Sequence, residues 1–374
     1  MRPDTKRTWA EIRPDHLVHN MIRIRAALPA GTKFLGVVKA DAYGHGAEEV
    51  SRALERHGAD YLAVAGLDEA MALRRAGVGL PILILGHTPP EYVPELLEHR
   101  LTQTVTNRAK AEEYSAAARA LGGTLRIHIK LDTGMSRLGF LCAGERFAQG
   151  VENVAASCRC PNLDPEGIYT HFAMSDEPGE EARTFTLAQL RLFTDMLSAL
   201  EGRGVRFRLR HCANSGAVVN YPEAVFDMVR PGLLLYGYGG GEKFSDLKPG
   251  MRLLTRISTI KHYDPGARVS YGGTWTAEAR TRMGVIPIGY ADGLPRSTGG
   301  KSEFYVAGGF APQRGRVCMD MCMIDLSGLP EAEVGSVVEI FGDHASLDAL
   351  ARQAGTISYE LLCGVSKRVP RVYL

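Results

Sequence analysis

The feature that most constrains the fold is the alternation of short β-rich runs with longer stretches of helical periodicity between residues 33 and 238. The β-rich runs cover residues 34–39, 61–65, 81–85, 102–105, 124–131, 167–172, 206–211 and 226–230. Helical candidates lie between them at 47–57, 67–75, 107–121 and 180–202, the last with Phe185, Leu190, Phe193, Met196, Leu197 and Leu200 as its apolar face. Eight strand-then-helix units over roughly 210 residues predict an α/β fold, a parallel (β/α)8 barrel of the triosephosphate-isomerase type. A doubly wound open sheet is the alternative, but the usual Gly-x-Gly-x-x-Gly after a first strand is missing.

A second domain is expected after Tyr238, where three glycines at 239–241 are followed by strand-like runs separated by turn residues. A chain of 374 residues also exceeds the size, about 250 to 300 residues, at which a single core stops growing. We therefore expect a barrel at 13–240 and a mainly antiparallel β domain at 241–374. Residues 8–12 are β-prone, so residues 1–12 are expected to join the β domain.

Composition narrows the class of partner. The 44 Lys and Arg residues nearly balance the 42 Asp and Glu residues, which argues against nucleic acid or an anionic membrane as partner. The seven cysteines do not form the paired clusters of a zinc site, so no metal is expected. No apolar run approaches the roughly 20 residues of a membrane span, and no apolar segment follows the polar N-terminus. We expect a cytoplasmic protein that acts on a small molecule.

Polar residues fall where the predicted barrel strands end, which is where barrel enzymes carry their chemistry. They are Lys39 and Tyr43 after the first strand, Arg137 after the fifth, His171 at the sixth, Asn214 and Ser215 after the seventh, and Arg230 at the eighth. Burial of Lys39 behind an apolar run would favour a neutral amine, which can form a Schiff base. The alternatives are a lysine that reaches solvent past the strand end, a helix N-cap for Ser215, and an interior ion pair for Arg230.

Eight motifs, in order along the whole chain, resemble those of the alanine racemases. They are VVKADAYGHG at 37–46, KLDTGMSRLG at 130–139, THFA at 170–173, HCANS at 211–215, RPG at 230–232, VSYG at 269–272, GYADG at 289–293 and RVCMD at 316–320. This family uses pyridoxal 5'-phosphate bound in a barrel that is followed by a β domain. The resemblance implies interconversion of L- and D-alanine, which supplies D-alanine for bacterial peptidoglycan.

The resemblance also implies roles for residues of the barrel. Lys39 would carry the cofactor, and its phosphate would be bound by Tyr43, Ser215, Gly232, Leu233 and Tyr359, with Asn214 and His171 also in contact with the cofactor. Arg230 would face the pyridine nitrogen with His211 hydrogen-bonded behind it. Arg137 would meet the cofactor's phenolic oxygen and the substrate carboxylate. In related enzymes the lysine that matches Lys130 can be carbamylated; an unmodified Lys130, paired with acidic or carbonyl oxygens, is the open alternative.

Further roles fall on the second domain and imply a homodimer with shared active sites. Tyr271 would be the second catalytic base, supplied across a head-to-tail dimer, with His171 hydrogen-bonded to its hydroxyl. Tyr290, Met319 and Asp320 would come from the same partner subunit and shape the entrance or bind carboxylate. Racemisation needs one base to remove a proton and another to return one on the opposite face, so Lys39 and Tyr271 would share the work.

Three rival functions remain open at this point. A pyridoxal-phosphate barrel decarboxylase would carry a glycine-rich phosphate loop and an acidic partner for the ring nitrogen, and neither is found. A single-domain cofactor-binding protein would lack residues 252–374 and Tyr271. A serine or broad-specificity racemase is the closest alternative, although the bulk of Tyr359 should crowd a longer side chain.

Overall fold

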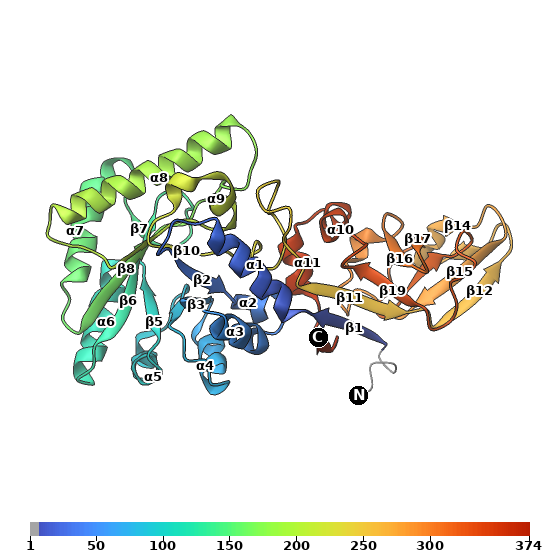
Figure 1. Ribbon diagram of the computed structural model, residues 1–374, viewed down its shortest axis with the longest axis horizontal. Helices are drawn as coiled ribbons and strands as arrows, with labels where there is room; N and C mark the ends of the chain where they lie inside the picture. The colour runs from blue at the N-terminus through green and yellow to red at the C-terminus, as the bar shows by residue number, and fades with distance from the viewer. Residues whose placement is uncertain (1–6) are drawn as a thin grey trace. The chain divides into compact units, whose positions relative to one another are not determined.

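The computed structural model describes residues 7–374, which divide into two compact units. The barrel unit comprises residues 17–42 and 47–248, and the β unit comprises residues 7–16, 43–46 and 249–374 (Figure 1). The chain therefore passes between the units more than once. Residues 43–46, which belong to the β unit, follow closely after Lys39.

The barrel unit contains eight parallel strands. They are β2 (Lys33–Val37), β3 (Tyr61–Val64), β4 (Ile82–Ile84), β5 (Thr102–Val105), β6 (Leu125–Asp132), β8 (Leu163–Tyr169), β9 (Leu209–His211) and β10 (Met228–Val229). They pair in the order β10-β2-β3-β4-β5-β6-β8-β9, and the short β7 (Phe140–Leu141) adds to β6. Backbone hydrogen bonds from Asp227 to Arg210 and from Arg230 to Ala213 join the two end strands. The predicted barrel is confirmed.

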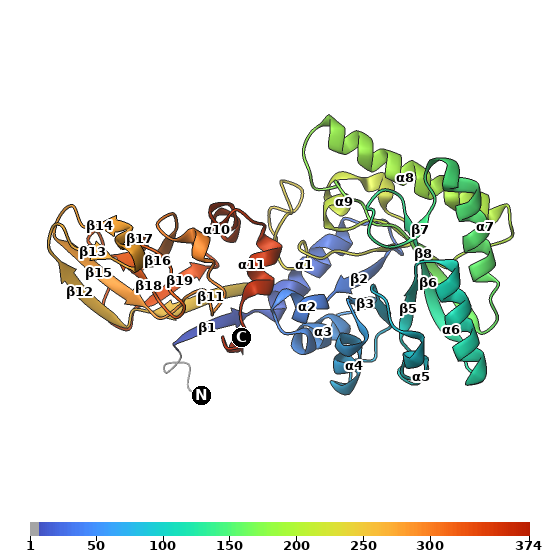
Figure 2. The ribbon, with the colours of Figure 1, turned by 180° about the vertical axis from the view of Figure 1, so that it is seen from behind.

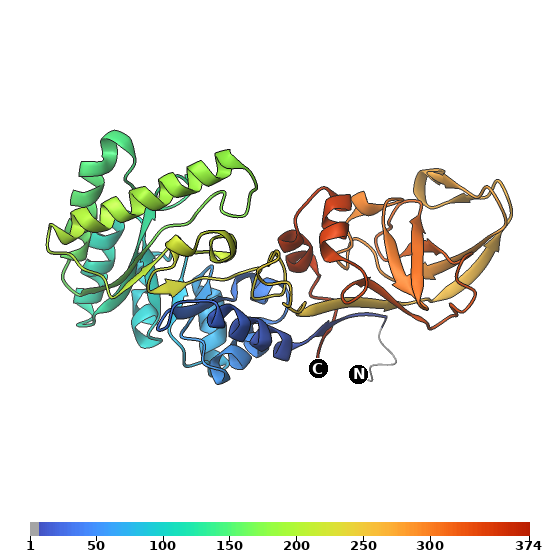
Figure 3. The same cartoon turned by 45° about the horizontal axis from the view of Figure 1, so that its top comes forward.

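Helices cover the outside of this barrel, as Figure 2 shows for α3 to α7. They are α1 (Pro14–Ala26), α3 (Ala47–Arg56), α4 (Leu67–Arg75), α5 (Val93–Glu98), α6 (Arg108–Ala120), α7 (Phe147–Cys158), α8 (Glu180–Glu201) and α9 (Ser215–Asn220). Helix α8, prominent in Figure 3, corrects one expectation: Phe185 is exposed, whereas Thr186 and Gln189 are buried beside Phe193. A polar residue on the inner face cannot be found from apolar periodicity.

The β unit is built on a nine-stranded, mainly antiparallel sheet in the order β12-β15-β18-β17-β16-β19-β11-β1-β20. Its strands are β1 (Thr8–Ile12), β11 (Met251–Arg256), β12 (Thr259–Tyr263), β15 (Thr281–Ile286), β16 (Glu303–Val306), β17 (Gly309–Arg314), β18 (Cys322–Asp325), β19 (Val337–Phe341) and β20 (Arg371–Tyr373). Strands β13 (Arg268–Val269) and β14 (Trp275–Thr276) form a separate hairpin, and α10 (Leu347–Ala354) and α11 (Ser358–Gly364) complete the unit. The mainly antiparallel β fold predicted for the C-terminal part of the chain is confirmed, and β1 pairs antiparallel to β11 and parallel to β20; residues 1–6, which were expected to join it, lie outside the described residues.

Within residues 7–374, no helix has the length and apolarity needed to cross a bilayer.

Candidate active site

A left-handed turn follows the first barrel strand and begins at Lys39. Ala40, Asp41, Ala42 and Tyr43 all have φ between 52° and 54°, in a region that residues with a Cβ enter at a cost of about 1–2 kcal/mol each. Two carboxylates help to hold this backbone: Glu69 accepts from the Ala40 N–H at 2.7 Å, and Asp41 accepts from the Ala47 N–H at 2.7 Å. Strained backbone of this kind concentrates at functional sites.

Lys130 and Arg137 lie at the end of β6 and in the loop after it. Asp132 accepts hydrogen bonds from the Gly134 and Ser136 N–H groups at 3.1 and 2.9 Å, which shapes this loop. Burial lowers the pKa of Lys130 to about 8, with the positive charges of Arg137 and Arg230 acting in the same direction and Asp132 against it. Lys130 is therefore a buried cation that lies close to other cations.

His171 follows β8 and is held by a residue that the sequence analysis missed. Burial lowers its pKa well below the usual value, and the charges of Arg230, Arg137 and Lys130 lower it further, so the ring is neutral near pH 7. The buried Gln189 of α8 donates to the His171 carbonyl and to Thr133 Oγ1, both at 3.2 Å, and accepts from the Ala173 N–H at 3.0 Å. Gln189 thus positions the loops after β6 and β8.

Arg230 is buried at the end of β10 and contacts His211, as expected. Its Nη1 lies 2.9 Å from His211 Nδ1, and its Nη2 donates to the carbonyl oxygens of Thr170 and Cys212 at 2.7 and 3.2 Å. The guanidinium carbon also lies 5.1 Å from the ring centroid of Tyr169. The interior ion pair considered from the sequence is not the arrangement found: among the described residues, no carboxylate lies within salt-bridge distance of Arg230.

Asn214, Ser215, Gly232 and Leu233 meet where the loops after β9 and β10 converge. Ser215 Oγ accepts from the Gly232 N–H at 2.9 Å and from the Leu234 N–H at 3.2 Å. Asn214 is the N-cap of α9, since its side-chain oxygen accepts from the Ala217 N–H at 3.0 Å. The N-cap alternative for Ser215 is therefore wrong, and its hydroxyl is directed to the loop after β10 instead.

Six candidates belong to the β unit. Tyr43 and Tyr359 lie together, with ring centroids 5.6 Å apart, and burial raises the pKa of Tyr43 far above its usual value. The other four lie around residues 316–320 and are Tyr271, Tyr290, Met319 and Asp320. Tyr271 is 69% exposed in the turn after Ser270, whose hydroxyl donates to the Arg316 carbonyl at 2.6 Å.

The backbone near residue 319 joins the remaining members of this group. The N–H of Tyr290 donates to the Cys318 carbonyl at 3.0 Å, and the N–H of Ala291 donates to the Met319 carbonyl at 3.0 Å. Asp320 accepts from Arg368 at 2.8 Å. The β unit therefore presents four exposed large side chains, Tyr271, Tyr290, Met319 and Met321, around one short segment.

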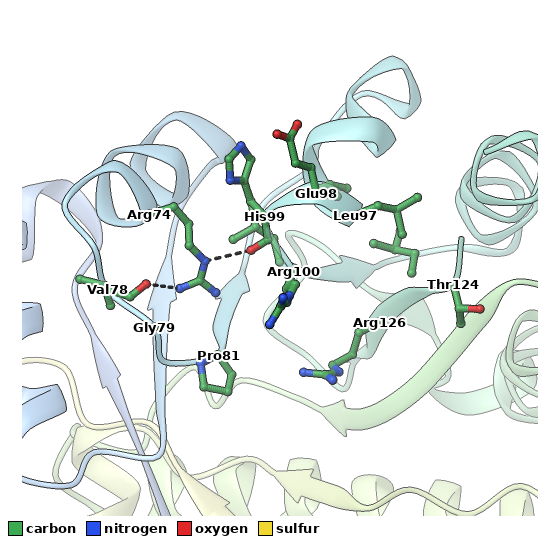
Figure 4. A pocket seen from close by; sticks show the side chains of 13 residues that line it. Arg74, Val78, Gly79, Pro81, Leu97, Glu98, His99, Arg100, Thr124 and Arg126 are labelled. Atoms are coloured by element: carbon green, nitrogen blue, oxygen red, sulfur yellow. Dashed lines mark hydrogen bonds between the residues drawn. The ribbon is translucent and has the colours of Figure 1, made fainter. Parts of the chain in front are cut away.

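A cavity of about 640 Å³ lies away from all of these residues (Figure 4). It is lined by loops that precede β4, β5 and β6, at the opposite end of the strands from Lys39 and Arg230. Arg74 closes one wall by donating to the carbonyl oxygens of His99 and Val78 at 2.9 and 2.7 Å. Barrel enzymes carry their chemistry at the other end, so we do not place the active site here.

The barrel residues form a site suited to an anionic ligand. The charges of Lys39, Arg137 and Arg230 lower the pKa of both Lys130 and His171, so four cationic side chains lie near one neutral imidazole. Among residues 7–374, no group of three His, Cys, Asp or Glu side chains is arranged to hold a metal ion. This geometry and the fold define a barrel enzyme whose ligand carries negative charge.

Comparison with known proteins identifies the family to which the chain belongs. The family profile described as "Alanine racemase, N-terminal domain" matches residues 12–239, and "Alanine racemase, C-terminal domain" matches residues 250–373. The chain therefore belongs to the alanine racemase family.

Individual relatives cover nearly the whole chain. An alanine racemase of Desulfovibrio desulfuricans is 43% identical, and alanine racemase 1 of Clostridium acetobutylicum is 42% identical; the alignments cover 98% of this chain and 98% and 95% of those proteins. The crystal structure of alanine racemase from a D-cycloserine-producing Streptomyces lavendulae has a TM-score of 0.92 at 37% identity, covering 100% of this chain and 98% of that one. A Clostridium difficile alanine racemase in complex with cycloserine has a TM-score of 0.89 at 36% identity, covering 99% and 96%.

Proposed function

We propose that this chain interconverts L- and D-alanine with pyridoxal 5'-phosphate attached to Lys39, and that Lys39 and Tyr271 are its two bases. Alanine racemisation is the activity of the family to which the chain belongs. The observation that supports the assignment of residues is that the buried Arg230 and Lys130 lie at the end of the barrel strands where Ser215 Oγ accepts from the Gly232 and Leu234 N–H groups. The charges of Lys39, Lys130, Arg137 and Arg230 also lower the pKa of His171.

The residues present fit this cofactor. Pyridoxal phosphate carries an anionic phosphate and phenolate oxygen. The cations supply donors for them, as does the Ser215 hydroxyl, whose oxygen accepts from the Gly232 and Leu234 N–H groups and whose own hydrogen can therefore point to a ligand. The phosphate would be held by Tyr43, Ser215, Gly232, Leu233 and Tyr359. Asn214 would also contact the cofactor, and Arg137 would meet its phenolic oxygen. When bound, the cofactor withdraws electrons from the substrate Cα and so makes its C–H bond more acidic.

Arg230 would fix the electronic character of the site. A guanidinium donates hydrogen bonds and neither loses nor gains a proton at ordinary pH. The pyridine nitrogen opposite Arg230 would therefore have to accept a hydrogen bond, and it would stay largely unprotonated. A weaker electron sink favours rapid return of the proton to Cα, as racemisation requires.

Two bases on opposite faces of the substrate would exchange the Cα proton. Lys39 would serve the D face and Tyr271 the L face, while Arg137 holds the substrate carboxylate with Met319 nearby. Tyr271, Tyr290 and Met319 are exposed aromatic and apolar side chains on the β unit, a feature typical of a contact surface. This supports a homodimer in which Tyr271 and its neighbours Tyr290 and Asp320 complete the site of the other subunit.

Complementation tests the shared site. Lys39→Ala and Tyr271→Phe homodimers should each be inactive or nearly so, because each site lacks one base. Equal amounts refolded together should form about half mixed dimers, each with one intact site, and restore about a quarter of wild-type activity if pairing is random. The assay follows L-to-D and D-to-L conversion of alanine, with serine as the competing substrate that tests the broad-specificity alternative.

Two outcomes would contradict parts of the proposal. If mixed dimers form but activity does not return, Tyr271 does not act across the dimer. If the wild-type protein converts serine as fast as alanine, the substrate assignment is wrong. A cytoplasmic location remains a prediction from the sequence.

A further inference from the structure

A chain of hydrogen bonds runs from Arg230 through the interior of the barrel towards the opposite end of the strands. His211 Nδ1 lies 2.9 Å from Arg230 Nη1, and His211 Nε2 lies 3.0 Å from His128 Nδ1. His128 Nε2 lies 3.2 Å from Glu166 Oε2. Both imidazoles are fully buried, and Glu166 is the middle residue of β8.

The residues at the two ends, Arg230 and Glu166, fix the direction of every hydrogen bond between them. Arg230 can only donate, so His211 Nδ1 must accept. In a neutral imidazole the other nitrogen then carries the proton, so His211 Nε2–H donates to His128 Nδ1. By the same reasoning His128 Nε2–H donates to Glu166, and a carboxylate can only accept. Every N–H in the chain therefore points from Arg230 towards Glu166.

The protonation states agree with this arrangement. Burial lowers the pKa of His128, and lowers that of His211 well below its usual value, so both rings are neutral near pH 7. Burial raises the pKa of Glu166, but hydrogen bonds from His128 and Tyr61 outweigh it and leave the pKa at about 2. A cation and an anion thus stand at the two ends of a neutral pair. The other carboxylate oxygen of Glu166, Oε1, lies 3.7 Å from Arg126 Nε and 3.8 Å from Arg208 Nη2, so Oε2 is the oxygen that faces the barrel interior.

The backbone is shaped to admit the His128 ring. Strand β6 shifts register against β8 between Ile127 and His128. On β8, an added Cβ at Gly167 would lie 2.6 Å from His128 Cε1 and 2.7 Å from both ring nitrogens, so only glycine leaves the ring its place. Tyr169, also on β8, stacks on His211 with ring centroids 4.8 Å apart.

We propose that Glu166 and His128 are positioning residues that act on Arg230 through His211: the one-way chain supplies the buried guanidinium with a distant counter-charge and fixes its orientation. The observation that calls for such a partner is that Arg230 is buried against carbonyl oxygens without a contacting carboxylate in the part of the chain that the structure describes. A buried cation without a compensating charge is strongly destabilising. The importance of Arg230 for the reaction rests on the proposed function, whereas the existence of this series of hydrogen bonds does not.

The first test measures the tautomers of the two histidines directly. The holoenzyme is labelled with 15N-histidine, the resonances are assigned with His128→Gln and His211→Gln, and long-range 1H–15N correlations show which nitrogens carry hydrogen. We expect both rings to be neutral with hydrogen on Nε2. Hydrogen on Nδ1 of either ring would overturn the one-way chain, whatever the catalytic activity of the protein.

The second test separates the charge of Glu166 from its shape. Glu166→Gln retains an amide oxygen for His128 but removes the negative charge, and we expect kcat/KM to fall by about tenfold, the lower end of what loss of a supporting partner costs in metal sites. The absorption spectrum of the bound cofactor should shift as well. Tyr61→Phe is the matched control, because Tyr61 donates to the same oxygen at 2.5 Å and its removal leaves the charge in place.

A double-mutant cycle shows whether Glu166 acts on Arg230 or merely on local packing. Glu166→Gln should lower the melting temperature when Arg230 is present and should lower it less, or not at all, in an Arg230→Met background, where there is no buried cation to compensate. The effect of Tyr61→Phe should be the same in both backgrounds. Equal effects of Glu166→Gln in both backgrounds would overturn the counter-charge role, even if the protein proved to catalyse a different reaction.

Discussion

Replacement of Gln189 by leucine should destabilise the barrel unit and disturb the loop that holds His171. The change removes three hydrogen bonds, to Thr133, to the His171 carbonyl and from the Ala173 N–H. At about 1 kcal/mol each, these hydrogen bonds contribute about 3 kcal/mol to the free energy of unfolding, while burial of the apolar atoms of leucine adds about 1 kcal/mol. We expect a net loss of about 2 kcal/mol, which lowers the melting temperature by about 4–8 °C for a unit of this size.

Thermal unfolding followed by circular dichroism measures the loss, and steady-state assays should show a lower kcat/KM because His171 is no longer held. Gln149→Leu is the matched control: it makes the same chemical change on the exposed face of α7, where Gln149 donates to Asn153 at 3.1 Å. Its effect should stay within about 0.5 kcal/mol of wild type. The reasoning is refuted if Gln189→Leu is no more destabilising than Gln149→Leu.

Three further predictions follow from the barrel interior. Gly167→Ala should cost about 1–3 kcal/mol by forcing the His128 ring aside, whereas Gly328→Ala, where an added Cβ meets open space, should be nearly neutral; equal melting temperatures would contradict the packing argument. Because the pKa of Lys130 is lowered to about 8, much of its amine is neutral near that pH and can react with CO₂, so 13C-bicarbonate should give a carbamate signal that Lys130→Arg removes. A signal that survives this substitution belongs to another lysine. Lys39→Ala should leave no cofactor bound covalently after borohydride reduction, and mass spectrometry that finds it on another lysine would refute the attachment site.

The sequence predicted the barrel well, and with it the strand ends at which the candidate residues lie, because both follow from local patterns. Strands such as 61–65 and 102–105 are short apolar or β-branched runs. Because all the strands are parallel, the residues that follow them lie at the same end of the barrel. Lys39, Arg137, His171 and Arg230 could therefore be placed at one end of the barrel before any contact was known. The roles of these residues came from the resemblance to a family, because the spacing of the motifs alone does not indicate a role.

The residues that were missed depend on packing between distant segments. Gln189 was assigned to no role because a buried amide looks like a surface residue in a periodic pattern, and its partners lie in two other loops. Glu166 precedes a glycine in the middle of a strand and gave no signal of its own. His128 lies within the predicted strand 124–131, but only the structure shows that His211 and Glu166 are its partners.

The position of β1 has a consequence for how the chain can be synthesised. Thr8 pairs with Thr255, 247 residues later, and β1 lies between β11 and β20 in the finished sheet. At about 5–20 residues per second, a ribosome needs roughly 12 to 50 s to deliver the first of these partners. For that time the nascent chain carries a strand with both edges unpaired while the barrel sequence is made behind it. Cutting the gene between the two halves would therefore leave one fragment with an orphan strand and the other with a gap in its sheet.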